Sequence, residues 1–217
     1  MSDNKFSVAA DQYISLDGQL TNIKNKVRLG LEKPRCPYNP EQIAKALQDI
    51  IEGKFNHTVE NKILRLISAD ENLLINAVDG KSTIAKAKDV FKSWIDGDFK
   101  SWGTNEAQNS TPETPVSVYE VFSDAKLAQM FGSLSGDLDR LCLTQSQIIN
   151  FCIKYPTWLK QDGSATFFLF KSNEQYFVAD VYVRSGGLRV FVLRLGFDYV
   201  WNGSYLHRLV TPTTGVA

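Results

Sequence analysis

The tetrapeptide Gly80-Lys81-Ser82-Thr83 is the part of the sequence that comes nearest to a catalytic motif. It matches the end of the pattern G-x-x-x-x-G-K-[ST], in which two glycines let backbone N–H groups surround a phosphate. The first of those glycines would fall at position 75, which is Ile75. A β-branched side chain avoids the positive φ angles that glycine permits. We therefore expect an Asp79-Gly80 turn followed by a capped helix, and no nucleotide site.

Two carboxylate pairs have the D-x-D spacing of some metal sites, Asp96 with Asp98 and Asp137 with Asp139. Side chains two residues apart in a turn or strand can converge on one cation. Neither pair has further oxygen donors nearby in the sequence. Turns at helix ends, where acidic residues favour the N-terminus, explain both pairs. A metal-dependent hydrolase is therefore kept only as an alternative function.

Cysteine and histidine are sparse in this chain, which has Cys36, Cys142, Cys152, His57 and His207. The cysteines lack the C-x₂₋₄-C spacing of a closed zinc site. Cys152 stands among apolar residues, which predicts a buried and inert thiol. A nucleophile pair would require His207 to reach Cys142 or Cys152 from a different element, and no local motif supports it. We predict no catalytic residue, no metal ligand and no cofactor.

A mixture of aromatic and basic side chains in the C-terminal part could form a ligand surface: Tyr176, Tyr182, Arg184, Arg189, Arg194 and Arg208. Rings on a sheet can stack on bases while arginines contact phosphates. Strand alternation places Tyr176, Asp180, Tyr182 and Arg184 on one face, which is polar enough to be exposed. Nucleic-acid binding, helped by the basic segment 24–35, is therefore an alternative. The other interpretation is a sheet covered by helices, with its arginines at edges and in solvent.

The composition is that of an ordinary soluble globular protein, with 217 residues, 43% hydrophobic and 22% charged. The formal net charge is zero, so no overall field attracts the chain to nucleic acid or membranes. The sequence contains no apolar run of membrane-spanning length and no signal-peptide pattern at its start. Three cysteines are too few for a disulfide framework and fit a reducing compartment. These features predict a cytoplasmic protein without a membrane partner.

Composition and pattern divide the chain into four segments. Residues 1–36 are polar and basic, and residues 37–102 read as a lobe of helices and short strands. Residues 103–116, GTNEAQNSTPETPV, have the composition of a linker. Residues 117–217 read as helices followed by strands.

In the first lobe we expect a helix at Asn39–Gly53, strands at Ile63–Ile67 and Leu73–Val78, and a helix after Gly80.

The second lobe has the clearer pattern. Val118–Phe122 and Leu127–Phe131 suggest one interrupted helix or two short helices, and a capping box at Thr144–Gln147 begins another. Four β runs follow, separated mostly by polar turns: Thr166–Lys171, Gln175–Arg184, Leu188–Leu195 and Tyr205–Val210. Their natural pairing is a four-stranded antiparallel meander on which the helices pack. The predicted fold class is therefore α+β, with an N-terminal helical and short-strand lobe.

The stretch LCLTQSQIINFCIKYPTWLKQDGSATFFLFK at 141–171, together with FDYVW at 197–201, resembles uncharacterised proteins from uncultured candidate-phylum bacteria. The resemblance implies a bacterial cytosolic origin and carries no activity. Taken together, the sequence favours a non-enzymatic binding or protein-interaction module. Its partner is expected to be a protein, with nucleic acid as the alternative.

Overall fold

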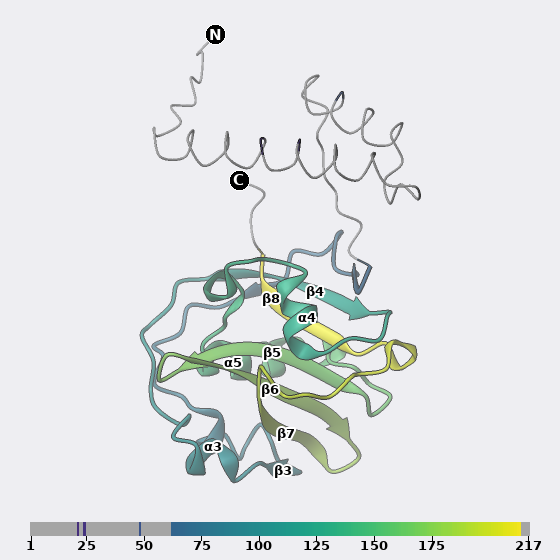
Figure 1. The fold of residues 1–217 in the computed structure, drawn as a ribbon. Coiled ribbons are helices and arrows are strands. Elements are labelled where there is room, and N and C mark those ends of the chain that lie inside the picture. The colour runs from purple at the N-terminus through teal and green to yellow at the C-terminus, as the bar shows by residue number, and fades with distance from the viewer. Residues whose placement is uncertain (1–20, 22–23, 25–47, 49–61, 214–217) are drawn as a thin grey trace. The chain divides into compact units, whose positions relative to one another are not determined.

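The computed structural model describes residues 62–213 together with residues 21, 24 and 48. Contacts divide the chain into two units, residues 1–58 and 59–217. Cys36, His57, and almost all of the basic segment 24–35 and the expected helix Asn39–Gly53 lie outside the described residues. The second unit contains an eight-stranded mixed sheet (Figure 1).

Its strands are β1 (Leu64–Leu66), β2 (Leu74–Ile75), β3 (Trp94–Ile95), β4 (Thr114–Val121), β5 (Ala165–Ser172), β6 (Gln175–Arg184), β7 (Gly187–Arg194) and β8 (Arg208–Pro212). Its α-helices are α3 (Asp98–Ser101), α4 (Leu127–Gly132) and α5 (Gln145–Lys154). Short 3₁₀ turns complete it: η1 (Ile84–Lys86), η2 (Leu138–Leu141), η3 (Pro156–Trp158) and η4 (Gly203–Tyr205).

The predicted fold class is wrong, because the sheet is larger and mixed. The strand order is β1-β4-β8-β5-β6-β7-β3, with β2 paired to β4. β5, β6 and β7 do form the expected antiparallel run. The fourth predicted strand does not return beside β7. Instead, β8 lies between β4 and β5, antiparallel to β4 and parallel to β5.

The strand β4 occupies residues that the sequence assigned to a linker and a helix. Its TPVSVYEV segment is rich in β-branched residues, which suit a pleated sheet better than a helix. Val116 and Val118 pack into one hydrophobic cluster, and Val121 packs into another. Pairing with β1, β2 and β8 satisfies the backbone of this strand on both sides. Long-range pairing therefore overrides the apolar spacing that suggested a helix.

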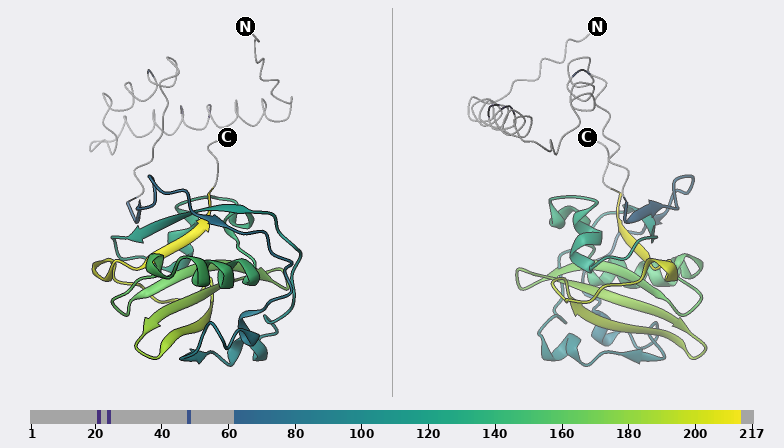
Figure 2. Two further views of the ribbon diagram at one scale, coloured as in Figure 1. Left: turned by 180° about the vertical axis from the view of Figure 1, so that it is seen from behind. Right: turned by 45° about the vertical axis from the view of Figure 1, so that its right-hand side comes forward.

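Helices α4 and α5 lie on opposite faces of the sheet (Figures 1 and 2). The α5 face of the sheet includes Phe168, Phe170 and Phe177, and packs against Ile148 and other apolar residues of α5. The α4 face includes Phe167, Leu169 and Val178, and packs against Leu127, Met130 and Phe131 of α4. The sheet is thus buried on both faces along its central strands.

The capping box predicted for α5 is confirmed. Thr144 Oγ1 accepts from the backbone N–H of Gln147, and Gln147 Oε1 accepts from the backbone N–H of Thr144 at 2.8 Å. Cys152 is buried on this helix, and burial raises the pKa of its thiol. Leu159, just beyond the helix, is fully buried, while Trp158 packs against the same cluster and is partly buried.

The turn at Gly80 is present, but the α-helix expected after it is not. Gly80 has φ +76°, and a Cβ there would lie 2.2 Å from the carbonyl oxygen of Gln108. The chain continues as η1 and turns before reaching β3. Gln108 itself, in the segment expected to be a linker, hydrogen-bonds through its side chain to Gln145 N and Lys171 O. Residues 103–116 therefore contact the rest of the second unit.

Candidate functional site

A pocket of about 220 Å³ opens on the α4 face beside the end of β6. Five of its lining residues are aromatic: Tyr182, Tyr199, Trp201, Tyr205 and His207. Gly163, Ser164 and Asn202 complete the lining. We call this site the aromatic pocket. Ring faces together with a few polar groups are the usual lining of small-ligand sites.

The aromatic rings of the pocket pack on one another. The Trp201 ring lies 4.7 Å from Phe167 and 5.0 Å from Tyr199, measured between centroids and edge to face. The His207 ring lies 5.1 Å from Trp201 and 5.8 Å from Tyr205. Tyr199 and Tyr205 are 52% and 60% exposed, so much of their ring surface remains open to a ligand.

The loop that carries Tyr199, Trp201 and Tyr205 joins β7 to β8 and is fixed in place. Backbone hydrogen bonds of 2.9 and 3.1 Å pair Trp201 with Ala125. The N–H of Gly203 donates to Asp124 Oδ1 at 2.9 Å, and a Cβ at Gly203 would lie 2.5 Å from Ser123 N. The rings are thus held before any ligand arrives, which reduces the entropic cost of binding.

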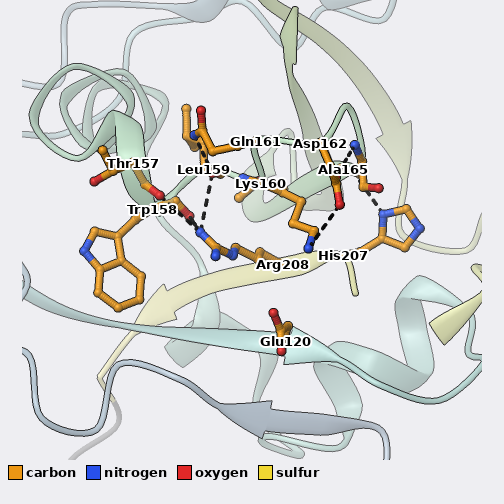
Figure 3. Close-up of polar contacts among 12 residues, drawn as sticks. Glu120, Thr157, Trp158, Leu159, Lys160, Gln161, Asp162, Ala165, His207 and Arg208 are labelled. Atoms are coloured by element: carbon orange, nitrogen blue, oxygen red, sulfur yellow. Dashed lines mark hydrogen bonds and ion pairs between the residues drawn. The ribbon is translucent and has the colours of Figure 1, made fainter. Parts of the chain in front are cut away.

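His207 is held as a neutral imidazole. Its Nδ1 accepts the backbone N–H of Ala165 at 3.0 Å (Figure 3). Burial lowers the pKa of His207 to about 4, with Asp162 opposing the shift. The residue before it, Leu206, has φ 49°, an uncommon conformation for a side chain larger than glycine. This strained conformation directly precedes His207, whose imidazole packs in the aromatic cluster.

A buried carboxylate lies behind the pocket. Asp180 is 3% exposed, and its Oδ2 accepts from the hydroxyl of Tyr182 at 3.0 Å. Its Oδ1 has no partner among the described residues. Burial raises the pKa of Asp180 to about 7, and the bond from Tyr182 opposes that shift. The sequence predicts an exposed side chain at this position, but the structure buries it.

Two arginines extend the site along β6 and β7. The Arg184 guanidinium lies 5.2 Å from the Tyr182 ring centroid, and that of Arg189 lies 4.5 Å from Phe191 and 5.8 Å from Trp94. The strand register places Arg189 opposite both Tyr182 and Trp94. We call Trp94, Arg189, Phe191, Tyr182 and Arg184 the aromatic–arginine row. Neither arginine forms an ion pair with a carboxylate of residues 62–213.

The structure brings together three of the six residues predicted as a ligand surface, Tyr182, Arg184 and Arg189. Tyr176 lies outside the row and donates to Asp139 Oδ1 at 3.0 Å. Arg194 lies over Trp102, at 5.0 Å, and over Phe177, so it is on the α5 face.

Arg208 also points away from the pocket. Its Nη1 donates to the carbonyl oxygen of Trp158 at 2.8 Å (Figure 3). Its guanidinium lies over the ring of Trp158, which packs against the cluster on the α5 face, whereas His207 packs against Phe167 and Trp201 on the α4 face.

The carboxylate pairs of the sequence are used locally. Asp96 Oδ1 accepts from Asp98 N, and Asp137 Oδ1 accepts from Asp139 N, at the starts of α3 and η2. Asp139 also forms an ion pair with Lys171 at 3.1 Å. Within residues 62–213, no group of three or more His, Cys, Asp or Glu side chains is arranged to hold a metal ion.

The thiols do not approach the histidine in the way a nucleophile pair requires. Cys142 Sγ donates to Leu138 O at 3.4 Å, and burial raises its pKa to about 12. Cys152 lies in the cluster on the α5 face, whereas His207 packs against Phe167, Trp201 and Tyr205.

Three ring-bearing residues of the pocket were missed from the sequence: Tyr199, Trp201 and Tyr205. The signal was the clustering of Phe197, Tyr199, Trp201, Tyr205 and His207 around the turn residues of one loop. Strand periodicity carries no information about the loop that joins the last two strands, so it does not place these rings beside β6.

No protein-family model, curated protein or solved structure matches the chain. Among the described helices, none has the length and apolar character needed to cross a bilayer.

Proposed function

We propose that the chain is a non-enzymatic binding module that takes single-stranded nucleic acid along the aromatic–arginine row, with one base in the aromatic pocket. The observation that carries this proposal is the position of Arg184 and Arg189. Both guanidinium groups lie over ring faces without a described carboxylate partner, next to an open cluster of rings. Cationic groups beside exposed rings are the combination that single-strand binders use.

Both the aromatic rings and the arginines of the site have interaction energies that favour a polynucleotide. Stacking of a base on an aromatic side chain contributes about 1–3 kcal/mol and tolerates any base. Trp94, 52% exposed, and Tyr199 offer rings at the two ends of the site. Arginine binds phosphate oxygens through two parallel N–H groups, so Arg184 and Arg189 suit the backbone between stacked bases.

A protein partner is the second candidate. Phe122, Phe197 and Val200 are 44%, 47% and 50% exposed, and Gly203 of the pocket loop packs against the backbone next to Phe122. Exposed apolar side chains that gather in one region suit a protein interface. This candidate gives no role to the unpaired arginines, which is why nucleic acid is preferred.

The proposal predicts that Arg184→Glu weakens binding of a labelled single-stranded oligonucleotide at least about tenfold at low salt. Arg194→Glu is the matched control, because Arg194 is also exposed and over rings but lies on the opposite face. Fluorescence anisotropy against salt concentration measures both variants. Wild-type affinity should fall as salt rises, and the control should stay within about twofold. Equal losses in the two variants, or no binding by wild type, would refute the proposal and favour a protein partner.

A further inference from the structure

Two polar side chains of the aromatic pocket, His207 and Asn202, have their donor and acceptor atoms fixed by backbone N–H groups. A backbone N–H can only donate, so the atom that receives it must be an acceptor. Ala165 N–H donates to His207 Nδ1 at 3.0 Å, so that nitrogen carries no proton. The proton of the neutral imidazole is therefore on Nε2, which has no hydrogen-bond partner among the described residues.

The side-chain amide of Asn202 is also fixed by a backbone N–H group. Its Oδ1 accepts the N–H of Ser204 at 2.8 Å, which caps η4. The side-chain amide nitrogen is left with two N–H groups and no described partner. Asn202 lines the pocket and is exposed. The second fixed polar group of the pocket is therefore also a donor.

The other polar groups do not offset this bias. The hydroxyl groups of Ser164, Tyr199 and Tyr205 can donate or accept, because each hydrogen rotates. The hydroxyl hydrogen of Tyr182 is directed to Asp180 behind the pocket. Only His207 and Asn202 have a polarity that the backbone sets, and both present N–H groups.

We propose that the pocket selects a pyrimidine ring with two carbonyl oxygens, uracil or thymine, over cytosine. This inference rests on the proposed function and specifies the base that the pocket takes. Uracil offers carbonyl oxygens at C2 and C4, one for each donor. Cytosine has an amino group at C4, which sets a donor against a donor and leaves one pocket N–H unpaired. An unpaired group in a binding site costs more affinity than a weak contact contributes.

The test compares oligodeoxyuridine with oligodeoxycytidine of equal length by anisotropy. The two differ only at the base edge, and both are flexible pyrimidine strands. Wild type should bind the uridine strand about tenfold more tightly, the discrimination expected for one well-placed hydrogen bond. Asn202→Asp keeps the oxygen that caps η4 and turns the donor into an acceptor. In this variant the ratio of the two affinities should fall to about one or reverse, whatever the added charge does to both affinities.

His207→Asn is the second variant. It keeps an acceptor for Ala165 N–H but is too short to place a donor where Nε2 lies, so it should also lower the ratio. Equal wild-type affinities for the two strands, together with a loss in Arg184→Glu, would overturn the base preference and leave the proposed function standing. A ratio that Asn202→Asp leaves unchanged would also overturn it. Binding of neither strand would overturn both proposals.

Discussion

The unfolding free energy of the Asp180→Asn variant, relative to that of wild type, is expected to be higher at pH 8 than at pH 4. The folded-state pKa of Asp180 is raised to about 7 by burial, above the value near 3.9 of an unfolded aspartate. At pH values between these two pKa values, the Asp180 carboxyl has lost its proton in the unfolded chain but keeps it in the folded chain. Wild-type stability is therefore lost as pH rises from about 4 to 7, and stays low above that.

The asparagine variant does not titrate, and its amide oxygen can still accept from Tyr182. Its unfolding free energy relative to wild type should grow by about 4 kcal/mol between pH 4 and pH 8. Urea unfolding at several pH values measures this difference. Asp198→Asn is the control: Lys126 lowers the pKa of that exposed carboxyl, so its protonation is linked to stability mainly below about pH 4, and the difference from wild type should stay nearly constant between pH 4 and pH 8. A constant difference for Asp180→Asn would mean that the carboxyl is not buried as described.

Phe151→Ala should destabilise the protein strongly, by about 3–5 kcal/mol. Phe151 is fully buried on α5, and its ring lies 5.4 Å from those of Phe168 and Tyr155. Removing the ring leaves a cavity between the helix and the sheet. Ile153→Ala, two residues away and 60% exposed, should cost less than about 1 kcal/mol. Urea unfolding of both variants measures the contrast, and comparable costs would show that α5 does not cover the sheet through this face.

Local signals made α5 and the first three strands of the predicted meander readable from the sequence. The Thr144–Gln147 capping box is complete within four residues. The hairpin from β5 to β6 turns at Asn173 and Glu174, whose φ angles of 48° and 57° suit a two-residue turn. A tight turn of this kind pairs the two strands that it connects, so their pairing can be predicted from the local sequence.

The place of β8 could not be read in this way, because its partners lie far away in the chain. Thr166 pairs with Arg208, and Ser117 pairs with Thr211, across many intervening residues. The same long-range contacts decide whether a segment such as Val118–Phe122 becomes a strand or a helix. Periodicity describes which side chains share a face, but it does not say which strand lies beside them.

In the candidate site too, local signals place some residues and long-range contacts place the others. Tyr182, Arg184 and Arg189 lie together because one hairpin sets their register, and that hairpin was predicted. Tyr199 and Trp201 join them only because a bridge to Ala125 pins the loop. The local sequence around Arg208 predicts a surface position, because it holds no information about the strand that pairs with β8. Its position opposite Thr166 directs it to the carbonyl groups near Trp158.

Photo-crosslinking with a single strand that carries 5-iodouracil tests the proposed site most directly, because each crosslink marks a residue in contact with a base. Mass spectrometry of the crosslinked peptides should place them on the loop with Tyr199, Trp201 and Tyr205, and on Tyr182 or Trp94. Crosslinks confined to the α5 face, or to the segment 24–35, would contradict this assignment, as would the absence of any specific crosslink.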